Sequence, residues 1–155
     1  MLKRPKFKPG EILVIPLSEH SFGYAQVIRD DDFGCFIRVF DHLTKEICPI
    51  EELQGGLKVK DRAYVNNSSA RGRWKHLGFA PLRAEDEKMP TLFYGSSCSC
   101  WTVQNENKPE QYIKGESTNR AALRSKGYTH KVLWLAKDFE DLLQHNTPLI
   151  WPGSD

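Results

Sequence analysis

The chain has 155 residues, of which 39% are hydrophobic and 27% charged, a composition typical of one globular domain and not of a disordered segment. Its 22 Lys and Arg against 20 Asp and Glu give a net charge of +2, too balanced to indicate a nucleic-acid or membrane partner. No apolar run approaches the roughly 18 residues that span a bilayer, and the basic N-terminus lacks the apolar stretch of a signal peptide. We therefore expect a cytoplasmic protein whose four cysteines are reduced.

The N-terminal part of the chain predicts a short tail followed by an antiparallel meander. Residues 1–7 are basic, so we expect a flexible tail there and a single domain over residues 8–155. Three β-branched and aromatic runs follow, separated by a polar turn and an Asp-rich turn with Gly34. The strands are expected at Glu11–Ile15, ended by Pro16, at Phe22–Ile28 and at Cys35–Phe40.

The middle of the chain mixes turn signals with short β segments. Pro49 followed by two acids and a Gly-Gly stop indicates one helical or 3₁₀ turn over Pro49–Gln54. Strand character follows at Leu57–Val65, and Asn66–Gly72 has the composition of a loop. A short strand and its exit are expected within Arg73–Leu82, then an exposed charged connection over Arg83–Pro90.

The last third alternates strands with helical patterns. We expect Thr91–Tyr94 and Cys100–Val103 to pair as strands, and a fragment of strand at Tyr112-Ile113. Helices are indicated at Thr118–Gly127 and Asp138–His145, around a strand at Lys131–Leu135. The whole pattern predicts a mainly β fold of α+β class: a curved antiparallel sheet or a β-sandwich with two or three short helices.

No catalytic or metal-binding pattern stands out. Cys98 and Cys100 with His76 or His130 would make a zinc site of unusual spacing, and no second cysteine pair matches it. A hydrolase using Cys98 or Cys100 with His130 would lack any residue that marks a base beside a nucleophile. Phosphate-binding glycine loops are absent. We predict no enzyme activity, no metal, no cofactor and no small-molecule substrate.

One basic segment with an aromatic residue could bind nucleic acid. Arg71, Arg73, Trp74 and Lys75 lie within Arg71–His76, where phosphate contacts and base stacking would suit a single strand. A strand whose Trp74 points into the core explains the same pattern. A small nucleic-acid-binding β domain is therefore the alternative function.

Three acidic clusters lie in expected turns, and they could dock a basic protein because complementary charge accelerates association. Solvated surface charge explains them as well.

The opening also resembles a bacterial family, the immunity protein 26 family of polymorphic and contact-dependent growth-inhibition toxin systems. The resemblance rests on Lys8-Pro9-Gly10-Glu11-Ile12, Ile15-Pro16-Leu17, the run Phe22 to Val27, the strand Phe36 to Asp41, and a Trp-x-x-Leu-Gly-x-x-Pro-Leu element at Trp74–Leu82. Glu11 stands where the family usually has Asp. The similarity covers about residues 8–94 and is thin beyond them.

This resemblance implies a mostly β, non-enzymatic protein that neutralises one cognate toxin domain. Such toxins are commonly nucleases, here expected to be the C-terminal domain of a large secreted or surface protein bound one-to-one. The family offers no shared catalytic residues, and Gly10, Pro16, Gly23 and Trp74 are interpreted as fold residues. Because nucleases are basic around their sites, the hypothesis for the toxin contacts takes the acids of two turns: Asp30, Asp31, Asp32, Glu85, Asp86 and Glu87.

Overall fold

The computed structural model divides the chain into two compact units. Unit 1 comprises residues 1–82 and 133–149, and unit 2 comprises residues 83–132 and 150–155. The structure describes residues 6–18, 20–54, 57–86, 89–95, 100–105, 108–114 and 120–145, without the side chains of 86, 100, 108–114 and 120–122. Among these residues, no helix has the length and apolar character needed to cross a membrane.

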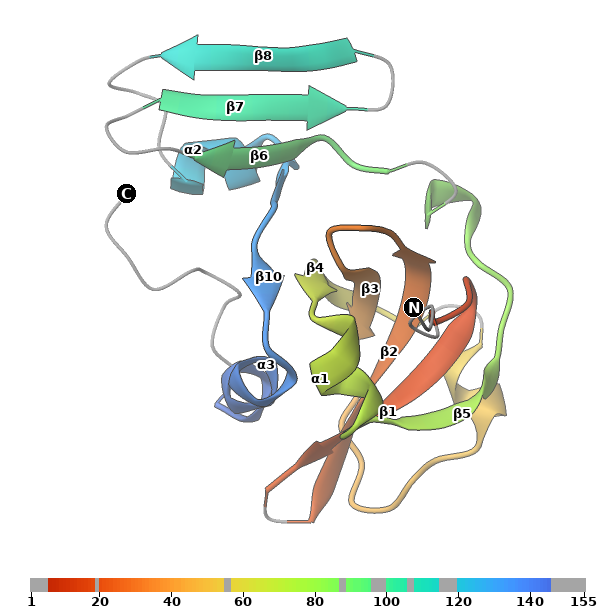
Figure 1. Ribbon diagram of the computed structural model, residues 1–155. Coiled ribbons are helices and arrows are strands. Elements are labelled where there is room, and N and C mark those ends of the chain that lie inside the picture. The colour runs from red at the N-terminus through yellow and green to blue at the C-terminus, as the bar shows by residue number, and fades with distance from the viewer. Residues whose placement is uncertain are drawn as a thin grey trace, which may run out of the picture. The chain divides into compact units, whose positions relative to one another are not determined.

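Unit 1 is built on a six-stranded sheet (Figure 1). In space its strands follow the order β10-β4-β3-β2-β1-β5. All neighbours pair antiparallel except β10, which lies parallel to β4. The strands are β1 (Glu11–Leu17), β2 (Ser21–Asp30), β3 (Cys35–Phe40), β4 (Val59–Val65), β5 (Lys75–Phe79) and β10 (Leu133–Trp134).

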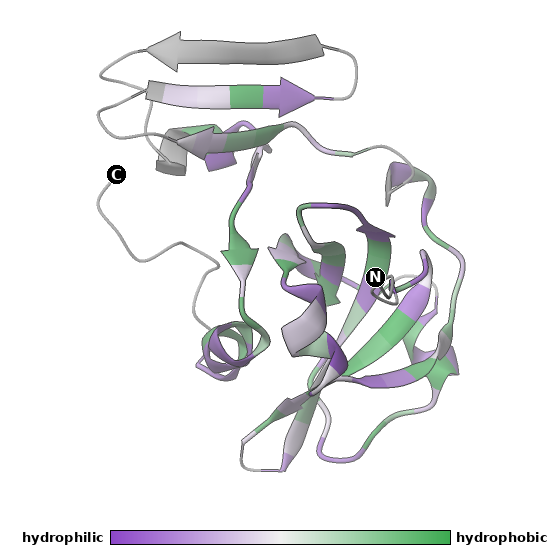
Figure 2. Ribbon diagram, in the orientation of Figure 1, coloured by the Kyte–Doolittle hydropathy of each residue, from purple (hydrophilic) through white to green (hydrophobic). Residues whose placement is uncertain are grey.

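One face of this sheet carries a hydrophobic core. Val14 of β1 pairs with Tyr24 of β2, and hydrophobic residues run along most of β1 (Figure 2). The 3₁₀ helix η1 (Ile50–Leu53) begins after Pro49 and closes the cluster. The buried members are Ile12, Val14, Tyr24, Phe40, Cys48, Leu53 and Ala80.

The helix α3 (Ala136–Gln144) packs against β1. Side chains alternate along a strand, so Leu13 and Ile15 point away from the core described above and are also buried. The buried face of α3 carries Phe139 and Leu143, and the Phe139 ring lies 5.8 Å from the Trp74 ring. We infer that α3 covers this second face.

The segment expected to be a loop at Asn66–Gly72 contains a helix, α1 (Asn67–Arg71). The Asn66 side chain accepts a hydrogen bond from the Ser69 amide at 3.0 Å, so the residues that indicated a loop act as a helix N-cap. The Ser69 hydroxyl in turn accepts a hydrogen bond from the Ala136 amide at 3.0 Å and links α1 to the start of α3.

Unit 2 contains a four-stranded sheet in the order β8-β7-β6-β9. Its elements are η2 (Ala84–Asp86), β6 (Leu92–Gly95), β7 (Cys100–Asn105), β8 (Lys108–Lys114), α2 (Arg120–Ser125) and β9 (Thr129–His130). The pairing of β6 with β7 confirms the expected hairpin. Its core gathers Phe93, Trp101, Val103 and Leu123.

The predicted fold class is confirmed: the chain is mostly β with short helices in an α+β arrangement. Several boundaries differ from the expected ones, among them those of β1, of β10 and of β8, which covers Lys108–Lys114 and not only Tyr112-Ile113. β1 continues through Pro16. At Pro16 only β2 pairs with β1, because β5 pairs with β1 no farther than Val14. Pro16 therefore lies at a local edge of the sheet, where proline is tolerated. The strand expected at Lys131–Leu135 is shorter, because β10 covers only Leu133–Trp134, and β9 ends at His130, before the expected segment begins. Phe7 belongs to the segment expected to be a flexible tail, but its side chain is buried, with 5% exposed. The expectation of a single domain over residues 8–155 remains a prediction.

Candidate functional site

The turn between β2 and β3 holds three of the predicted contact residues, and Asp31 gives it its shape. The Asp31 carboxylate accepts hydrogen bonds from the amides of Phe33 at 2.9 Å and Gly34 at 3.2 Å, an arrangement typical of Asp in turns. Its other oxygen accepts a hydrogen bond from the Tyr64 hydroxyl at 2.9 Å. Burial and this bond to the carboxylate raise the pKa of Tyr64. Asp31 therefore fixes the turn on β4.

Asp30 joins the turn to its surroundings. Its carboxylate accepts hydrogen bonds from the Phe7 amide at 2.8 Å and from the side-chain amide of Asn67 in α1. The Phe7 ring is covered by the Arg71 guanidinium, 4.3 Å from the ring centroid. The carboxylates of Asp30 and Asp31 are thus engaged within the chain.

The same turn presents two side chains to solvent. Asp32 is fully exposed, and its carboxylate lies 4.0 Å from the Lys6 ammonium. Phe33 is 36% exposed and packs edge-on against Tyr64, with ring centroids 4.9 Å apart. A charged and an aromatic side chain therefore project from a turn that hydrogen bonds hold in place.

The other predicted acids lie in unit 2. Glu85 is exposed, with its carboxylate 3.8 Å from the Arg83 guanidinium. Asp86 ends η2, but its side chain lies outside the described residues, as does the whole of Glu87. Asp30, Asp31 and Asp32 share one turn, whereas Glu85 and Asp86 belong to the other unit.

The predicted nucleic-acid patch is largely engaged in packing. Trp74 is 5% exposed, and its indole N–H donates to Glu140 of α3 at 3.2 Å. The Arg73 guanidinium donates to both oxygens of the same carboxylate at 2.7 and 2.8 Å, and this hydrogen bond and charge raise the pKa of Arg73. Arg71 covers the Phe7 ring, and the Lys75 side chain is exposed on β5. The Trp74 ring is not available for base stacking.

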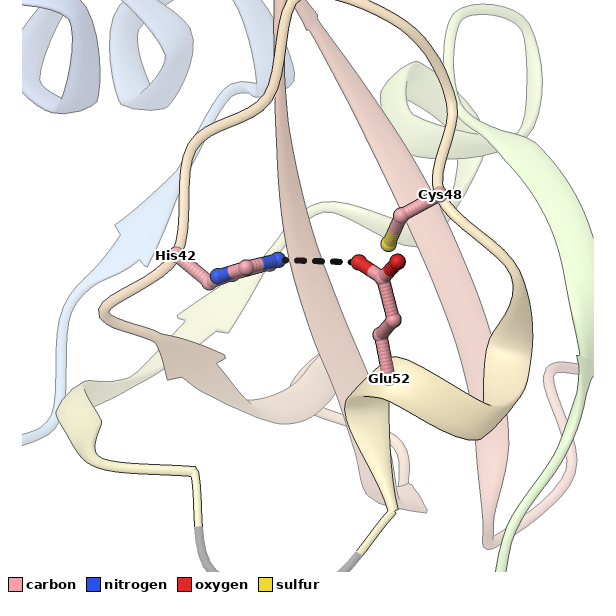
Figure 3. Close-up of side chains that lie close together, drawn as sticks. All are labelled: His42, Cys48 and Glu52. Atoms are coloured by element: carbon pink, nitrogen blue, oxygen red, sulfur yellow. Dashed lines mark ion pairs between the residues drawn. The ribbon is translucent and has the colours of Figure 1, made fainter.

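A cluster that sequence reasoning missed lies beside the core of unit 1. His42, Cys48 and Glu52 place a ring nitrogen, a thiol sulfur and a carboxylate oxygen within 4.8 Å of one another (Figure 3). The His42 Nε2 to Glu52 Oε2 distance is 3.6 Å. Their spacing in sequence matches no common metal motif, and the only signal was a His, a Cys and a Glu within eleven residues around Pro49.

This cluster does not have the features of an activated nucleophile. Burial is the main cause that raises the pKa of the Cys48 thiol, so the thiol stays protonated at neutral pH. The Tyr24 hydroxyl accepts a hydrogen bond from the Cys48 amide at 2.8 Å.

Of the residues considered for other chemistry, His130 stacks on Phe93 with ring centroids 4.7 Å apart in the core of unit 2. His76 lies on β5, with its ring nitrogen 3.1 Å from the Glu11 carboxylate. Cys98 and the side chain of Cys100 lie outside the described residues.

Comparison with known proteins identifies the family. The model of the family described as immunity protein 26 matches residues 8–104, which include the whole meander, Trp74, β6 and all of β7 but its last residue. No curated protein matches the chain, and no solved structure does. The match extends over more than half of the 155 residues. The chain therefore belongs to the immunity protein 26 family.

Proposed function

We propose that this immunity protein neutralises one cognate toxin domain by binding it one-to-one, without catalysis of its own. The single observation that carries the proposal is the family match over residues 8–104. The toxin domain is proposed to be a nuclease at the C-terminus of a large secreted or surface protein, met in the cytoplasm. Binding occludes the nuclease site or a neighbouring surface, so that its substrate no longer reaches the catalytic groups.

The turn between β2 and β3 is the proposed first contact. Its backbone is held by the bonds to Asp31, so little conformational entropy is lost when a partner docks on it. Asp32 offers an exposed carboxylate to a basic cleft, and Phe33 offers the type of aromatic side chain that often dominates interface energetics.

The net charge of +2 requires any attraction to a basic toxin to be local. Asp32 is proposed as a direct contact, and Glu85, Asp86 and Glu87 remain proposed as a second acidic segment. Asp30 and Asp31 are proposed to act indirectly, since their carboxylates hold the turn.

The decisive experiment is a rescue. The C-terminal domain of the toxin encoded beside this protein is expressed in sensitive cells, with and without the protein. Any complex is purified, and its molecular mass is measured. Growth together with a one-to-one complex is the expected result. Unprotected cells with no complex would overturn the proposal.

Association kinetics then test the turn. Asp32→Lys reverses a fully exposed charge before β3, and Asp41→Lys makes the same change at an exposed position after the same strand. We expect Asp32→Lys to slow association at low salt by at least about threefold and to flatten its salt dependence. Asp41→Lys should leave the rate nearly unchanged. Equal rates for the two variants would contradict the placement of the contact.

A further inference from the structure

The loop that follows β3 brings three potential metal ligands together. His42 comes just after the strand, Cys48 lies near the end of the loop, and Glu52 projects from η1. Figure 3 shows the three side chains converging, with their donor atoms within 4.8 Å of one another. Cys48 is 6% exposed, whereas the Glu52 side chain is 53% exposed, so the cluster opens to solvent on the glutamate side.

A second observation points to a missing partner. The Nε2 atom of His42 is buried, yet it has no hydrogen-bond partner among the described residues. Its distance of 3.6 Å to the Glu52 carboxylate is too long for a hydrogen bond. Buried polar atoms are nearly always satisfied, and an imidazole nitrogen with a free lone pair is a common metal ligand.

The donor set decides which metal fits. Imidazole nitrogen, thiolate sulfur and carboxylate oxygen are all ligands of Zn²⁺, whereas Mg²⁺ and Ca²⁺ prefer oxygen donors alone. Zinc–ligand bonds of about 2.0–2.3 Å in a tetrahedron separate the donor atoms by roughly 3.3–3.8 Å. The His42 Nε2 to Glu52 Oε2 distance of 3.6 Å already lies in this range. The separations that involve the Cys48 sulfur are within 4.8 Å, so ion binding would require them to close by at most about 1 Å.

We propose that His42, Cys48 and Glu52 bind one Zn²⁺ ion, with water as the fourth ligand. As the Sγ–Zn bond forms, the Cys48 thiol gives its proton to solvent, while His42 binds through neutral Nε2 and Glu52 as a carboxylate. No electron is transferred. This inference is independent of the toxin proposal, because it concerns only groups within one loop and η1.

A bound metal would restrict the motion of the loop between β3 and η1, which exposes apolar side chains. Leu43 is 57% exposed and Ile47 is 39% exposed, and both lie between His42 and Cys48. On the inner side, the Tyr24 hydroxyl already contacts Thr44 and the Cys48 amide. A bound ion would fix both ends of the segment that carries these apolar residues and would raise the melting temperature of the folded protein.

Cobalt substitution tests the site directly. Reduced, metal-free protein is titrated with Co²⁺ and followed by absorption, and Zn²⁺ is then added in competition. We expect a thiolate-to-cobalt charge-transfer band, visible bands of tetrahedral cobalt, saturation at one equivalent, and loss of the bands on addition of Zn²⁺. A wild-type protein without a charge-transfer band would overturn the proposal.

Two variants assign the ligands. Glu52→Gln removes one donor at an exposed position, and Glu51→Gln makes the same change at the neighbouring exposed residue of η1. We expect Glu52→Gln to weaken Co²⁺ binding at least about tenfold and Glu51→Gln to change it less than about twofold. Cys48→Ser should abolish the charge-transfer band. Equal affinities of the two glutamate variants, or a band that survives in Cys48→Ser, would place the metal elsewhere and overturn the assignment.

Discussion

The Tyr24 hydroxyl joins two residues of the loop after β3, Thr44 and Cys48, to the sheet. Tyr24 is fully buried, and its hydroxyl accepts a hydrogen bond from the buried Cys48 amide at 2.8 Å and lies 2.6 Å from the Thr44 hydroxyl. Burial is the main cause that raises the pKa of Tyr24, so the hydroxyl keeps its proton over the range in which the protein would be studied. Tyr24→Phe removes this oxygen and leaves the ring in the core.

The size of the stability loss follows from the hydrogen bonds that Thr44 and Cys48 retain in Tyr24→Phe. The Thr44 hydroxyl retains its hydrogen bond to the Glu46 carbonyl at 2.5 Å, whereas the Cys48 amide is left buried without an acceptor. An unsatisfied buried donor costs about 1–3 kcal/mol. We therefore expect Tyr24→Phe to lower the free energy of unfolding by about 2 kcal/mol.

The assay is urea unfolding followed by tryptophan fluorescence, with amide hydrogen exchange at Cys48 as the local measurement. Tyr128→Phe is the control, because the Tyr128 side chain packs beside the core of unit 2 and its hydroxyl takes part in no hydrogen bond among the described residues. The control should change stability by less than about 0.5 kcal/mol. Equal stabilities of Tyr24→Phe and wild type, with unchanged exchange at Cys48, would refute the reasoning.

Two further predictions concern backbone and ionisation. Gly10 has φ of +89°, and an added Cβ would lie 2.8 Å from a backbone carbonyl oxygen. Gly10→Ala should therefore lower the free energy of unfolding in urea by about 1–3 kcal/mol. Gly72→Ala, where the atom nearest to an added Cβ is 3.9 Å away, should change this free energy by less than about 0.5 kcal/mol. Burial raises the pKa of Cys35 far above its ordinary 9.0, so above pH 9 the unfolded chain binds fewer protons than the folded one. Stability should then fall as pH rises, by up to about 1.4 kcal/mol per pH unit, and more steeply in wild type than in Cys35→Ala. A Gly10→Ala protein as stable as Gly72→Ala, or equal pH slopes, would contradict these expectations.

The meander could be predicted because its signals are local. Alternating apolar residues and turns rich in Gly, Asp and Ser fix strand positions without knowledge of the rest of the chain. The helix α1 was missed for a physical reason: Asn and Ser favour both loops and helix N-caps, and what decides between them here is the contact of Ser69 with the start of α3, 67 residues away in sequence.

The sites were less predictable than the fold. The sequence indicated the acidic turn, but not which aspartates are engaged within the chain and which is exposed. That distinction depends on the hydrogen-bond partners of Asp30 and Asp31, which are Phe7, Asn67 and Tyr64. The cluster of His42, Cys48 and Glu52 could not be predicted from the sequence for the same reason. Its geometry depends on the contact of the loop with Tyr24. The spacing of six and four residues between the three side chains also resembles no regular metal-binding motif.

The order in which unit 1 is completed has a consequence for synthesis in the cell. Its sheet receives its last strand, β10, only at Leu133, and α3 supplies buried residues up to Leu143. A ribosome therefore releases the meander long before it releases the helix that packs against β1. The hydrophobic face beneath α3 stays uncovered while residues 83–132 of unit 2 are translated, so unit 1 can complete its fold only after that part of unit 2 has been synthesised.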